Sequence, residues 1–359
     1  MYDIMKEKIL TVIVPSYNME ALLRKDLQSL LISKNPQRLE VIVINDGSKD
    51  QTLVIAQEFQ SRFPETFEVI DKPNGNYGSC INAGLKVATG KYIKIMDADD
   101  YFDTEVFEAF IDCLEKIDAD VVVNDYKKIY TGGKQEEFEY SFPSMQTIEI
   151  AEVYEESLFS SLLLPAITYR TSILRKMGYH QSEGISYTDM EWCYSPMTQM
   201  TTLFYFNRPI YMYIMGREGQ TMDPNIYQQR IPHIFKCLHS LMGSVENKEL
   251  VPWAKRFAVE QLAKHACAMY RYHLIDNPKY QRQFLWDFDA TLKDKNPEVY
   301  AICGTAEYRK KISYRYVEEW RLGRHEFIPF FVRVKEVVYN ILGTIHYYFL
   351  KFFNPELKR

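Results

Sequence analysis

Three kinds of pattern are missing from this chain of 359 residues. Its six cysteines are scattered, with no CxxC pair and no cysteine–histidine spacing typical of zinc, so a zinc module is excluded and buried thiols in a reducing compartment are expected. No GxGxxG follows the first predicted strand, and neither GxxxxGKS nor GxxxxGKT occurs anywhere. A dinucleotide-binding Rossmann site and a P-loop are therefore not indicated.

Long apolar runs and a strong charge excess are also absent. The first residues, MYDIMKEKIL, carry neither the basic start nor the cleavage site of a signal peptide, and no uninterrupted window of about 20 apolar residues follows. We therefore expect a cytoplasmic protein without a membrane span. A formal net charge of −5 argues against a general binder of nucleic acid or other polyanions, although a local basic patch stays open.

Short β-branched apolar runs alternate with helical patterns over about residues 8–125. The runs are 9–14, 39–44, 67–70, 91–96 and 119–123. They are nearly continuous rather than alternating, which is typical of strands buried on both faces. The segments between them place apolar residues three and four positions apart, as in amphipathic helices. This alternation predicts an α/β fold with a mostly parallel, Rossmann-like sheet flanked by helices.

Polar or glycine-rich segments follow four of these runs. They are VPSYN (14–18), NDGS (45–48), KPNGNYG (72–78) and DADD (97–100). Ligands bind parallel α/β sheets outside the carboxyl ends of the strands, so these segments are expected to meet at one edge. The coincidence predicts a site for a nucleotide-type ligand at that edge.

Three carboxylates crowd the end of the fourth run: Asp97, Asp99 and Asp100. Two carboxylates about 4 Å apart repel each other by roughly 4 kcal/mol at an effective dielectric constant of about 20. A divalent cation would offset that repulsion. The alternative is structural, with Asp100 or Asp103 as the cap of a helix that begins at about Thr104.

Four motifs together resemble the family 2 glycosyltransferases, which are inverting enzymes with the GT-A fold. TVIVPSYN, VIVINDGSKDQT, NYGSCINAGLKVATGKYIKIMDADDYF and ISYTDMEW occur in the order and approximate spacing of that family, over residues 8–222. The resemblance is to bacterial surface-polysaccharide glycosyltransferases. It implies a catalytic domain that binds a nucleotide sugar over residues 1–223. The change to a mainly helical pattern from about residue 226 predicts a boundary near Asp223-Pro224, followed by a helical C-terminal domain, 224–359.

The resemblance implies a nucleotide pocket built from the first two motifs. Asp46 would accept hydrogen bonds from the base, usually uracil, because a carboxylate suits an imide N–H donor. Pro15, Tyr17 and Asn18 would form the adjoining wall, with the ring of Tyr17 available to the ligand. A turn or helix-capping role is the alternative for Asp46.

Two further segments are expected to contact the donor. Lys72 and Asn82 belong to the family's next motif, where Asn82 would either hold the loop or touch the nucleotide. Glycines in the same motif permit a close approach of the backbone. Arg217 lies in a segment that resembles the family's mobile loop, in which a basic residue approaches the diphosphate. A solvated loop arginine is the alternative.

Asp97-Ala98-Asp99 matches the DXD motif of the family. The resemblance implies that Asp99 contacts a Mn²⁺ or Mg²⁺ ion that bridges the diphosphate, and that Asp97 lies near the sugar or the ribose. A Lewis acid stabilises the negative charge that accumulates on the leaving nucleoside diphosphate. Hard oxygen ligands favour these two cations over metals that prefer soft ligands.

Inverting transfer also needs a general base opposite the leaving group. EGISYTDMEW aligns with the family's Glu-Asp motif and places Asp189 on the catalytic aspartate, whereas Thr188 replaces the usual glutamate. Glu191 is a candidate substitute, but a helix would turn it about 200° away from Asp189. Asp189 is therefore the predicted base, with a helix N-cap as its alternative. Trp192 would either stack on a sugar face or lie in the core.

The remainder of the chain offers less chemistry. Residues 201–215 predict a hairpin or edge strands of the same sheet, and the segment from about 226 onward is mainly helical. Residues 327–353 form an aromatic-rich amphipathic tail that also carries lysine and arginine. This tail would either lie in a membrane interface at the inner face of the cell membrane or pack on the helical domain or on another subunit of a homo-oligomer.

The resemblance implies an inverting glycosyltransferase that moves a sugar from a nucleotide-diphospho sugar, expected to be a UDP-sugar, to a saccharide or lipid-linked saccharide acceptor in the synthesis of a surface polysaccharide. The QxxRW motif of processive polymer synthases is absent, which favours one sugar per encounter. Two alternatives stay open. One is a sugar-phosphate nucleotidyltransferase, which the lack of a glycine-rich triphosphate loop disfavours. The other is a non-catalytic nucleotide-sugar-binding or scaffold protein.

Overall fold

The computed structural model describes residues 8–216, 224–246, 249–276, 282–308 and 314–324, together with isolated positions between 330 and 342. The chain divides into two compact units, Met1–Ala258 and Val259–Arg359. The boundary predicted near Asp223-Pro224 adjoins residues 217–223, which lie outside the described ranges, so it stays a prediction. Arg217, a predicted donor contact, lies in that same segment.

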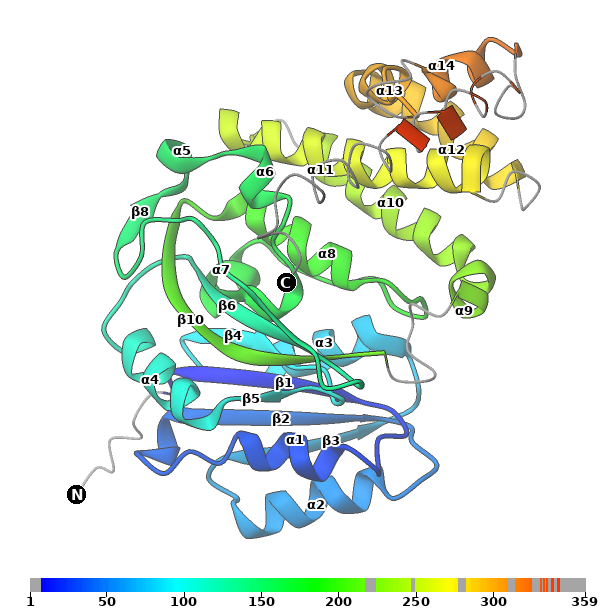
Figure 1. The fold of residues 1–359 in the computed structure, drawn as a ribbon. Helices are drawn as coiled ribbons and strands as arrows, with labels where there is room; N and C mark the ends of the chain where they lie inside the picture. The colour runs from blue at the N-terminus through cyan, green and yellow to red at the C-terminus, as the bar shows by residue number, and fades with distance from the viewer. Residues whose placement is uncertain are drawn as a thin grey trace. The chain divides into compact units, whose positions relative to one another are not determined.

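A mixed sheet forms the centre of the first unit (Figure 1). Its order is β3-β2-β1-β4-β9-β6-β10-β5, with β7 paired to β6 and β8 paired to β10. The strands are β1 (Leu10–Ser16), β2 (Leu39–Asp46), β3 (Phe67–Lys72), β4 (Tyr92–Ile95), β5 (Tyr101–Phe102), β6 (Val121–Tyr130), β7 (Gln135–Phe138), β8 (Thr147–Glu149), β9 (Ile167–Arg170) and β10 (Thr202–Met215).

The predicted parallel half of the sheet is present. Strand β1 pairs in parallel with β2 and β4, and β2 pairs in parallel with β3. Every residue of β1 and β2 is buried, as their continuous apolar sequences indicated. The rest of the sheet departs from the expectation, because β9 lies antiparallel between β4 and β6. The α/β class is therefore confirmed, with a mixed rather than mostly parallel sheet.

Strand β10 corrects the expectation of a hairpin at residues 201–215. It is one strand of 14 residues that runs parallel to β6 along its length. The register shifts between Phe206 and Pro209 and again between Pro209 and Tyr211. Proline lacks a backbone N–H for the ladder, so an irregularity at this position lets the strand continue past it.

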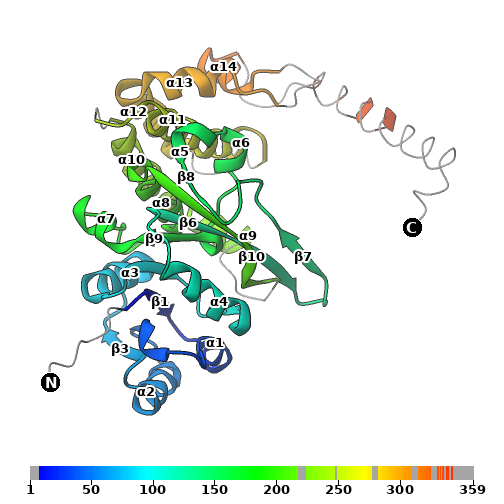
Figure 2. The same cartoon turned by 90° about the vertical axis from the view of Figure 1, so that its left-hand side faces the viewer.

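Helices cover both faces of the sheet (Figure 2). Helices α3 and α7 lie together on one face, where Arg175 of α7 donates to the carbonyl oxygen of Leu85 at 3.2 Å. Helices α1, α2 and α4 cover the other face. The helices of this unit are α1 (Leu23–Ser29), α2 (Thr52–Arg62), α3 (Asn76–Val87), α4 (Thr104–Leu114), α5 (Ile150–Val153), α6 (Glu156–Phe159), α7 (Thr171–Lys176), α8 (Asp189–Tyr194), α9 (Pro224–Gln229) and α10 (Ile231–Glu246), with 3₁₀ turns at Pro36–Arg38, Leu164–Ala166 and Pro196–Gln199.

The second unit is helical, which confirms the predicted character of the C-terminal region. Helix α11 (Pro252–Arg271) crosses the division between the units and continues into a π-helical turn at Tyr272–Asp276. It is followed by α12 (Arg282–Lys295), α13 (Pro297–Gly304) and α14 (Tyr316–Arg321). Within this unit, Asp289 accepts hydrogen bonds from Tyr270 and from Arg321, whose Nε lies 2.9 Å away.

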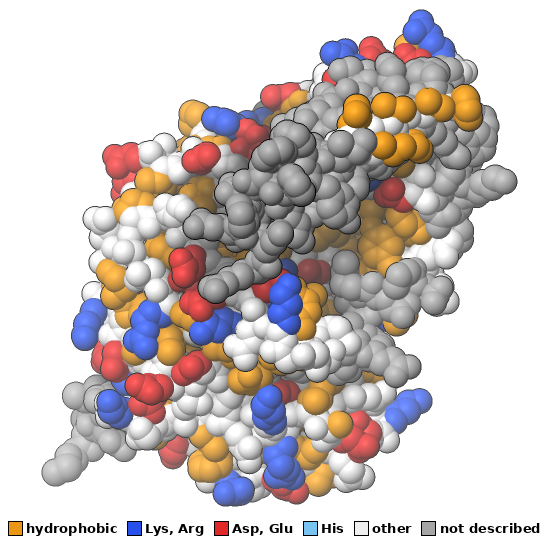
Figure 3. Space-filling model, in the orientation of Figure 1, with side chains coloured by type: hydrophobic (Ala, Val, Ile, Leu, Met, Phe, Trp, Pro, Cys, Tyr) orange, Lys and Arg blue, Asp and Glu red, His pale blue; other side chains and the backbone are white. Residues whose placement is uncertain are grey.

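The surface carries charges of both signs. Basic and acidic side chains are interspersed on the face drawn in Figure 3, rather than gathered into one patch of a single sign. Among the residues that the structure describes, no helix combines the length and the apolar character needed to cross a bilayer. Apart from a few positions, the predicted amphipathic tail at 327–353 lies outside the described residues.

Candidate active site

The loops that follow β1, β2, β3 and β4 meet at one edge of the sheet because these strands are parallel neighbours. Several residues there adopt the left-handed backbone conformation, including Asn18 (φ 53°), Gly47 (φ 70°) and Asn76 (φ 65°). A Cβ at Gly47 would lie 2.9 Å from the backbone nitrogen of Asn74, so both the conformation and the space require glycine. Tight turns of this kind let several loops share a small area.

Asp46 stands at the end of β2 and is buried, with 3% of its surface exposed. Its Oδ1 accepts a hydrogen bond from Lys72 Nζ at 2.5 Å and another from the backbone N–H of Gly75 at 2.9 Å. Lys72 also donates to Ser79 Oγ at 2.8 Å. This ion pair fixes the loop between β3 and α3 against the end of β2.

The predicted wall residues follow β1. Pro15 is buried within the strand, whereas Tyr17 beyond its end is 45% exposed. Asn18 links this loop to the one after β2, since its backbone N–H donates to Ser48 Oγ at 3.0 Å and its Oδ1 accepts from the N–H of Lys49 at 2.9 Å. Asn18 therefore holds two loops together, and the ring of Tyr17 is the part of this wall open to a ligand.

Asn82 of α3 holds a distant loop. Its Oδ1 accepts from the backbone N–H of Gln181 at 2.9 Å, and its Nδ2 donates to the carbonyl of Gln181 and to Glu183 Oε1, each at 2.8 Å. Nearby, the N–H of Gly184 donates to the carbonyl of Gly75 at 2.8 Å. Of the two roles predicted for Asn82, these contacts support the loop-holding one.

Asp100 is a structural residue. It is fully buried, its Oδ2 accepts from the hydroxyl of Tyr211 at 2.7 Å, and its Oδ1 accepts from the N–H of Ile214 at 2.7 Å. Burial and the charges of Asp97 and Asp99 raise the pKa of this carboxyl well above its usual range. Its two bonds to β10 fix the end of the DADD segment to the sheet.

Asp103 is the N-cap of helix α4. Its Oδ1 accepts from the backbone N–H of Val106 at 3.1 Å at the start of α4. The helix therefore needs none of the DXD carboxylates as its cap. Ala98 between them is buried, whereas Asp97 and Asp99 are half-buried. They lie at the edge of the sheet where the loops after β1, β2, β3 and β4 meet, which is called the rim below.

Asp97, Asp99 and Asp189 share one electrostatic neighbourhood. Burial, followed by the charge of Asp99, raises the pKa of Asp97 to about 7, against a hydrogen bond from the Tyr77 hydroxyl to its Oδ1 at 2.6 Å. The charge of Asp189 raises the pKa of Asp97 further. The raised pKa means that the ionised form of Asp97 is disfavoured, so a positive charge placed beside Asp97 would stabilise that form.

The side chains at this rim are of the type that coordinates a divalent cation. The groups that converge are carboxylates, the hard ligands that Mg²⁺ and Mn²⁺ prefer. Within the described residues, no cluster of three or more histidine, cysteine, aspartate or glutamate side chains is arranged to hold a metal ion.

Asp189 is the first residue of α8 and is exposed. Thr188 precedes it without capping the helix through its side chain, and Tyr187 has φ 68°, an uncommon conformation for a large side chain. The surrounding protein reduces hydration of the charged form and raises the pKa of Asp189, against the backbone N–H groups of Asp189 and Met190, which lower it. The turn at Tyr187 thus precedes an exposed carboxylate whose charge is felt by Asp97.

Glu191 and Trp192 face inward. Glu191 is 2% exposed, and its two oxygens accept from the backbone N–H and the hydroxyl of Ser182, each at 2.7 Å. Trp192 is fully buried, with ring centroids 5.1 Å from Tyr169 and 5.8 Å from Tyr179. Glu191 therefore anchors the loop before α8, Trp192 belongs to the core, and Asp189 is the exposed carboxylate of this helix.

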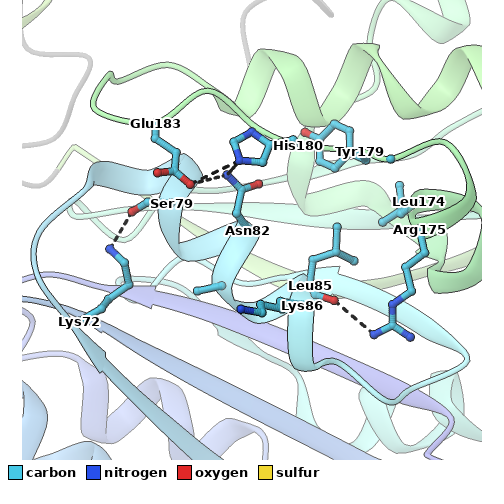
Figure 4. A pocket seen from close by; sticks show the side chains of 12 residues that line it. Lys72, Ser79, Asn82, Leu85, Lys86, Leu174, Arg175, Tyr179, His180 and Glu183 are labelled. Carbon is cyan, nitrogen blue, oxygen red and sulfur yellow. Dashed lines mark hydrogen bonds and ion pairs between the residues drawn. The ribbon is translucent and has the colours of Figure 1, made fainter.

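A cavity of about 640 Å³ opens beside Lys72, the partner of Asp46 (Figure 4). It lies between α3 and α7 with the loop that follows α7, and its lining includes Lys72, Ser79, Asn82 and Arg175. Neither Asp97 nor Asp189 lines it. The cavity thus adjoins the Asp46–Lys72 pair and is separate from the carboxylate group.

Three residues of this arrangement escaped sequence reasoning. Tyr77 lies inside a quoted motif, NYGS, but nothing in the sequence indicates that it reaches Asp97. Ser182 and Tyr211 act through contacts with segments far away in the chain, namely Glu191 and Asp100. Only a three-dimensional structure brings such partners together.

The family assignment follows from comparison with known proteins. Residues 11–177 match the family model described as Glycosyl transferase family 2. This segment is just under half of the chain and is similar to glycosyl transferase family 2, and the sheet with its flanking helices has the GT-A fold. The predicted resemblance and the predicted fold are thus confirmed. Asp189 lies beyond the matched segment, so its role rests on the geometry of the site.

Individual relatives agree with this assignment. An uncharacterized glycosyltransferase of Mycoplasma pneumoniae is 39% identical over 124 residues, which are 34% of this chain and 42% of that protein. The poly(ribitol-phosphate) beta-N-acetylglucosaminyltransferase TarS of Staphylococcus aureus is 26% identical over 216 residues, which are 59% of this chain and 36% of that protein. The chain therefore spans less than half the length of these curated relatives.

A solved structure resembles the chain over most of its length. The crystal structure of S. aureus TarS 1–349 in complex with UDP-GlcNAc has a TM-score of 0.63 and 19% sequence identity, and the match covers 88% of this chain and 93% of that one. At this level of identity the likeness shows the fold. The ligand in that structure belongs to that protein.

Proposed function

We propose that this protein is an inverting, metal-dependent glycosyltransferase that uses a nucleotide-diphospho sugar, most simply a UDP-sugar. Its acceptor is a saccharide or lipid-linked saccharide in the synthesis of a bacterial surface polysaccharide. The observation that carries the proposal is the convergence of Asp97 and Asp99 with the exposed Asp189, beside the loops that end the parallel strands. Similarity to this family and the fold of a neighbour bound to UDP-GlcNAc support the choice of donor.

The donor lies across the rim in this proposal. Asp46 accepts the imide N–H of uracil through Oδ2, since its Oδ1 holds Lys72 and Gly75, and the exposed ring of Tyr17 covers the base. Asp99 holds the cation. When bound, Mn²⁺ or Mg²⁺ neutralises charge that develops on the diphosphate. Arg217 approaches the same diphosphate.

Asp189 acts as the general base. It takes the proton of the acceptor hydroxyl while that oxygen attacks the anomeric carbon, and the bond from that carbon to the diphosphate breaks on the opposite face. The nucleoside diphosphate leaves with the bonding electrons, so the anomeric configuration is inverted. The raised pKa of Asp189 makes its carboxylate a stronger base than an ordinary aspartate.

Titration calorimetry of UDP tests the donor site. With Mn²⁺ present we expect a Kd in the micromolar range, which corresponds to a binding free energy of about −8 kcal/mol. When the metal is chelated, we expect the affinity for UDP to fall at least about tenfold. The loss follows because the crowded carboxylates then face the diphosphate without a neutralising charge. Equal affinity in both conditions would remove the metal from the proposal.

The same experiment tests which nucleobase the pocket at Asp46 binds. GDP and dTDP serve as controls, because both carry the diphosphate. Tight binding of GDP together with no binding of UDP would show that the pocket at Asp46 takes another base. Failure of all three nucleotides would overturn the proposed donor class.

The tail supports a second part of the proposal, association with the inner face of the cell membrane. The described positions Phe330, Val334, Val337, Val338, Ile341 and Leu342 are helical and exposed, with Phe330 exposed to 82%. Their spacings of three and four residues place them on one side of a helix, and basic residues lie between them in the sequence. An apolar stripe with basic neighbours suits a helix that lies in a membrane interface.

Flotation with liposomes that contain anionic lipid tests this part. We expect the full-length protein to float and a Val337→Glu/Ile341→Glu double variant to stay in the bottom fraction, because each glutamate places a charge in the apolar stripe. Val54→Glu is the matched control, since Val54 is 48% exposed on α2 of the first unit. Equal flotation of wild type and double variant would overturn membrane association through the tail.

A further inference from the structure

The carboxylate of Asp97 accepts a hydrogen bond from a single described side chain. The hydroxyl of Tyr77, the second residue of α3, donates to its Oδ1 at 2.6 Å. No other described residue donates a hydrogen bond to this carboxylate, so Oδ2 has no protein donor within the described part of the chain. Asp97 is half-buried at the rim, and its second oxygen can therefore receive a hydrogen bond from a ligand.

Tyr77 is well suited to act only as a donor. Burial and the nearby charges of Asp97 and Asp189 raise the pKa of its phenol well above the usual value, so the hydroxyl keeps its proton at neutral pH. The bond from this hydroxyl to Asp97 Oδ1, at 2.6 Å, is short for a hydrogen bond between two oxygens. That bond fixes which oxygen of Asp97 faces the protein and which faces the rim.

A second tyrosine–aspartate pair shows what a purely structural bond of this type looks like. Tyr205 donates to Asp125 Oδ1 at 2.7 Å, and the same oxygen accepts from the N–H of Tyr140 at 3.1 Å. Asp125 is 2% exposed inside the sheet. It is therefore shielded from any ligand, whereas the pair formed by Tyr77 and Asp97 lies at the rim where the carboxylates converge.

We propose that Tyr77 is a positioning residue for the donor: it holds Asp97 Oδ1 so that Oδ2 accepts a hydrogen bond from a hydroxyl of the nucleotide sugar. This inference rests on the proposed function and assigns a role to a residue outside the predicted donor set. Tyr77 acts through Asp97 and needs no contact with the reacting atoms. Its loss should therefore weaken donor binding more than it slows the chemical step.

The experiment compares the full-length wild type with Tyr77→Phe in calorimetric titrations with UDP and with UDP-GlcNAc, in the presence of Mn²⁺. We expect Tyr77→Phe to raise the Kd about tenfold, because an untethered Asp97 samples orientations that do not meet the ligand. Weakening with both ligands would place the hydroxyl on the ribose. Weakening with UDP-GlcNAc alone would place it on the sugar, and either result supports the inference.

Two controls separate positioning from stability. Tyr205→Phe removes a comparable bond from the core, so we expect a lower Tm than wild type with unchanged affinity for both ligands. In transfer assays, Tyr77→Phe should raise KM about tenfold and change kcat less than about threefold. Unchanged Kd in Tyr77→Phe would overturn the inference while the proposed function stands. Absence of binding in the wild type would overturn both.

Discussion

Asp189→Asn is expected to reduce sugar transfer by about 10²- to 10⁴-fold while leaving the affinity for UDP within about threefold of wild type. Asparagine has the shape of aspartate but cannot take the acceptor's proton. Asp189 is exposed and holds no loop in place, so the variant should unfold at the temperature of the wild type. Release of UDP from the donor in the presence of a saccharide acceptor measures the rate, and calorimetry measures the affinity.

Glu105→Gln is the matched control for this loss of charge. Glu105 is an exposed acid in the first turn of α4, as Asp189 is in the first turn of α8. Both substitutions remove a negative charge near a helix N-terminus, so any general effect of that change is shared by the two variants. Only Asp189→Asn should slow transfer. If it retained more than about a tenth of the wild-type rate, another group would have to be the base.

The parallel half of the fold could be predicted because its strands are buried on both faces and carry continuous apolar runs. The same runs end in polar loops, and this pattern is enough to locate the rim. Strand β9 could not be predicted in the same way. Its four residues, Ile167–Arg170, follow a segment without a clear period, and they join the sheet only because β4 and β6 pair with them from both sides.

In the site as well, features set by local sequence could be predicted, whereas contacts between residues far apart in the chain could not. The separation of Asp189 and Glu191 follows from helix geometry, and the structure agrees, with one carboxylate exposed and the other buried. The role of Asn82 stayed open in the sequence because its partners, Gln181 and Glu183, lie about a hundred residues away. Tyr77 illustrates the same limit, since a local motif does not show which carboxylate a hydroxyl reaches.

Gly78→Ala is expected to have the largest effect on stability, with a loss of about 2–4 kcal/mol in the free energy of unfolding. A Cβ at Gly78 of α3 would lie 2.0 Å from the carbonyl oxygen of Ser182 and 3.0 Å from its carbonyl carbon. Both atoms belong to the backbone, so no side-chain rotation relieves the overlap. The loop at 181–184 or the first turn of α3 must move instead. Urea unfolding measures the loss.

The same displacement should reach the chemistry. Asn82, Gly75 and Glu191 all hydrogen-bond the loop that Gly78 touches, and this loop leads directly to Asp189. Gly243→Ala is the control: Gly243 lies in helix α10, and a Cβ at this position would meet nothing within 4 Å, so alanine there should stabilise the protein by about 0.5–1 kcal/mol. If Gly78→Ala unfolded at the wild-type urea concentration, the loop would not be clamped to α3. In that case the close packing of Gly78 against Ser182 could not be what positions Asp189.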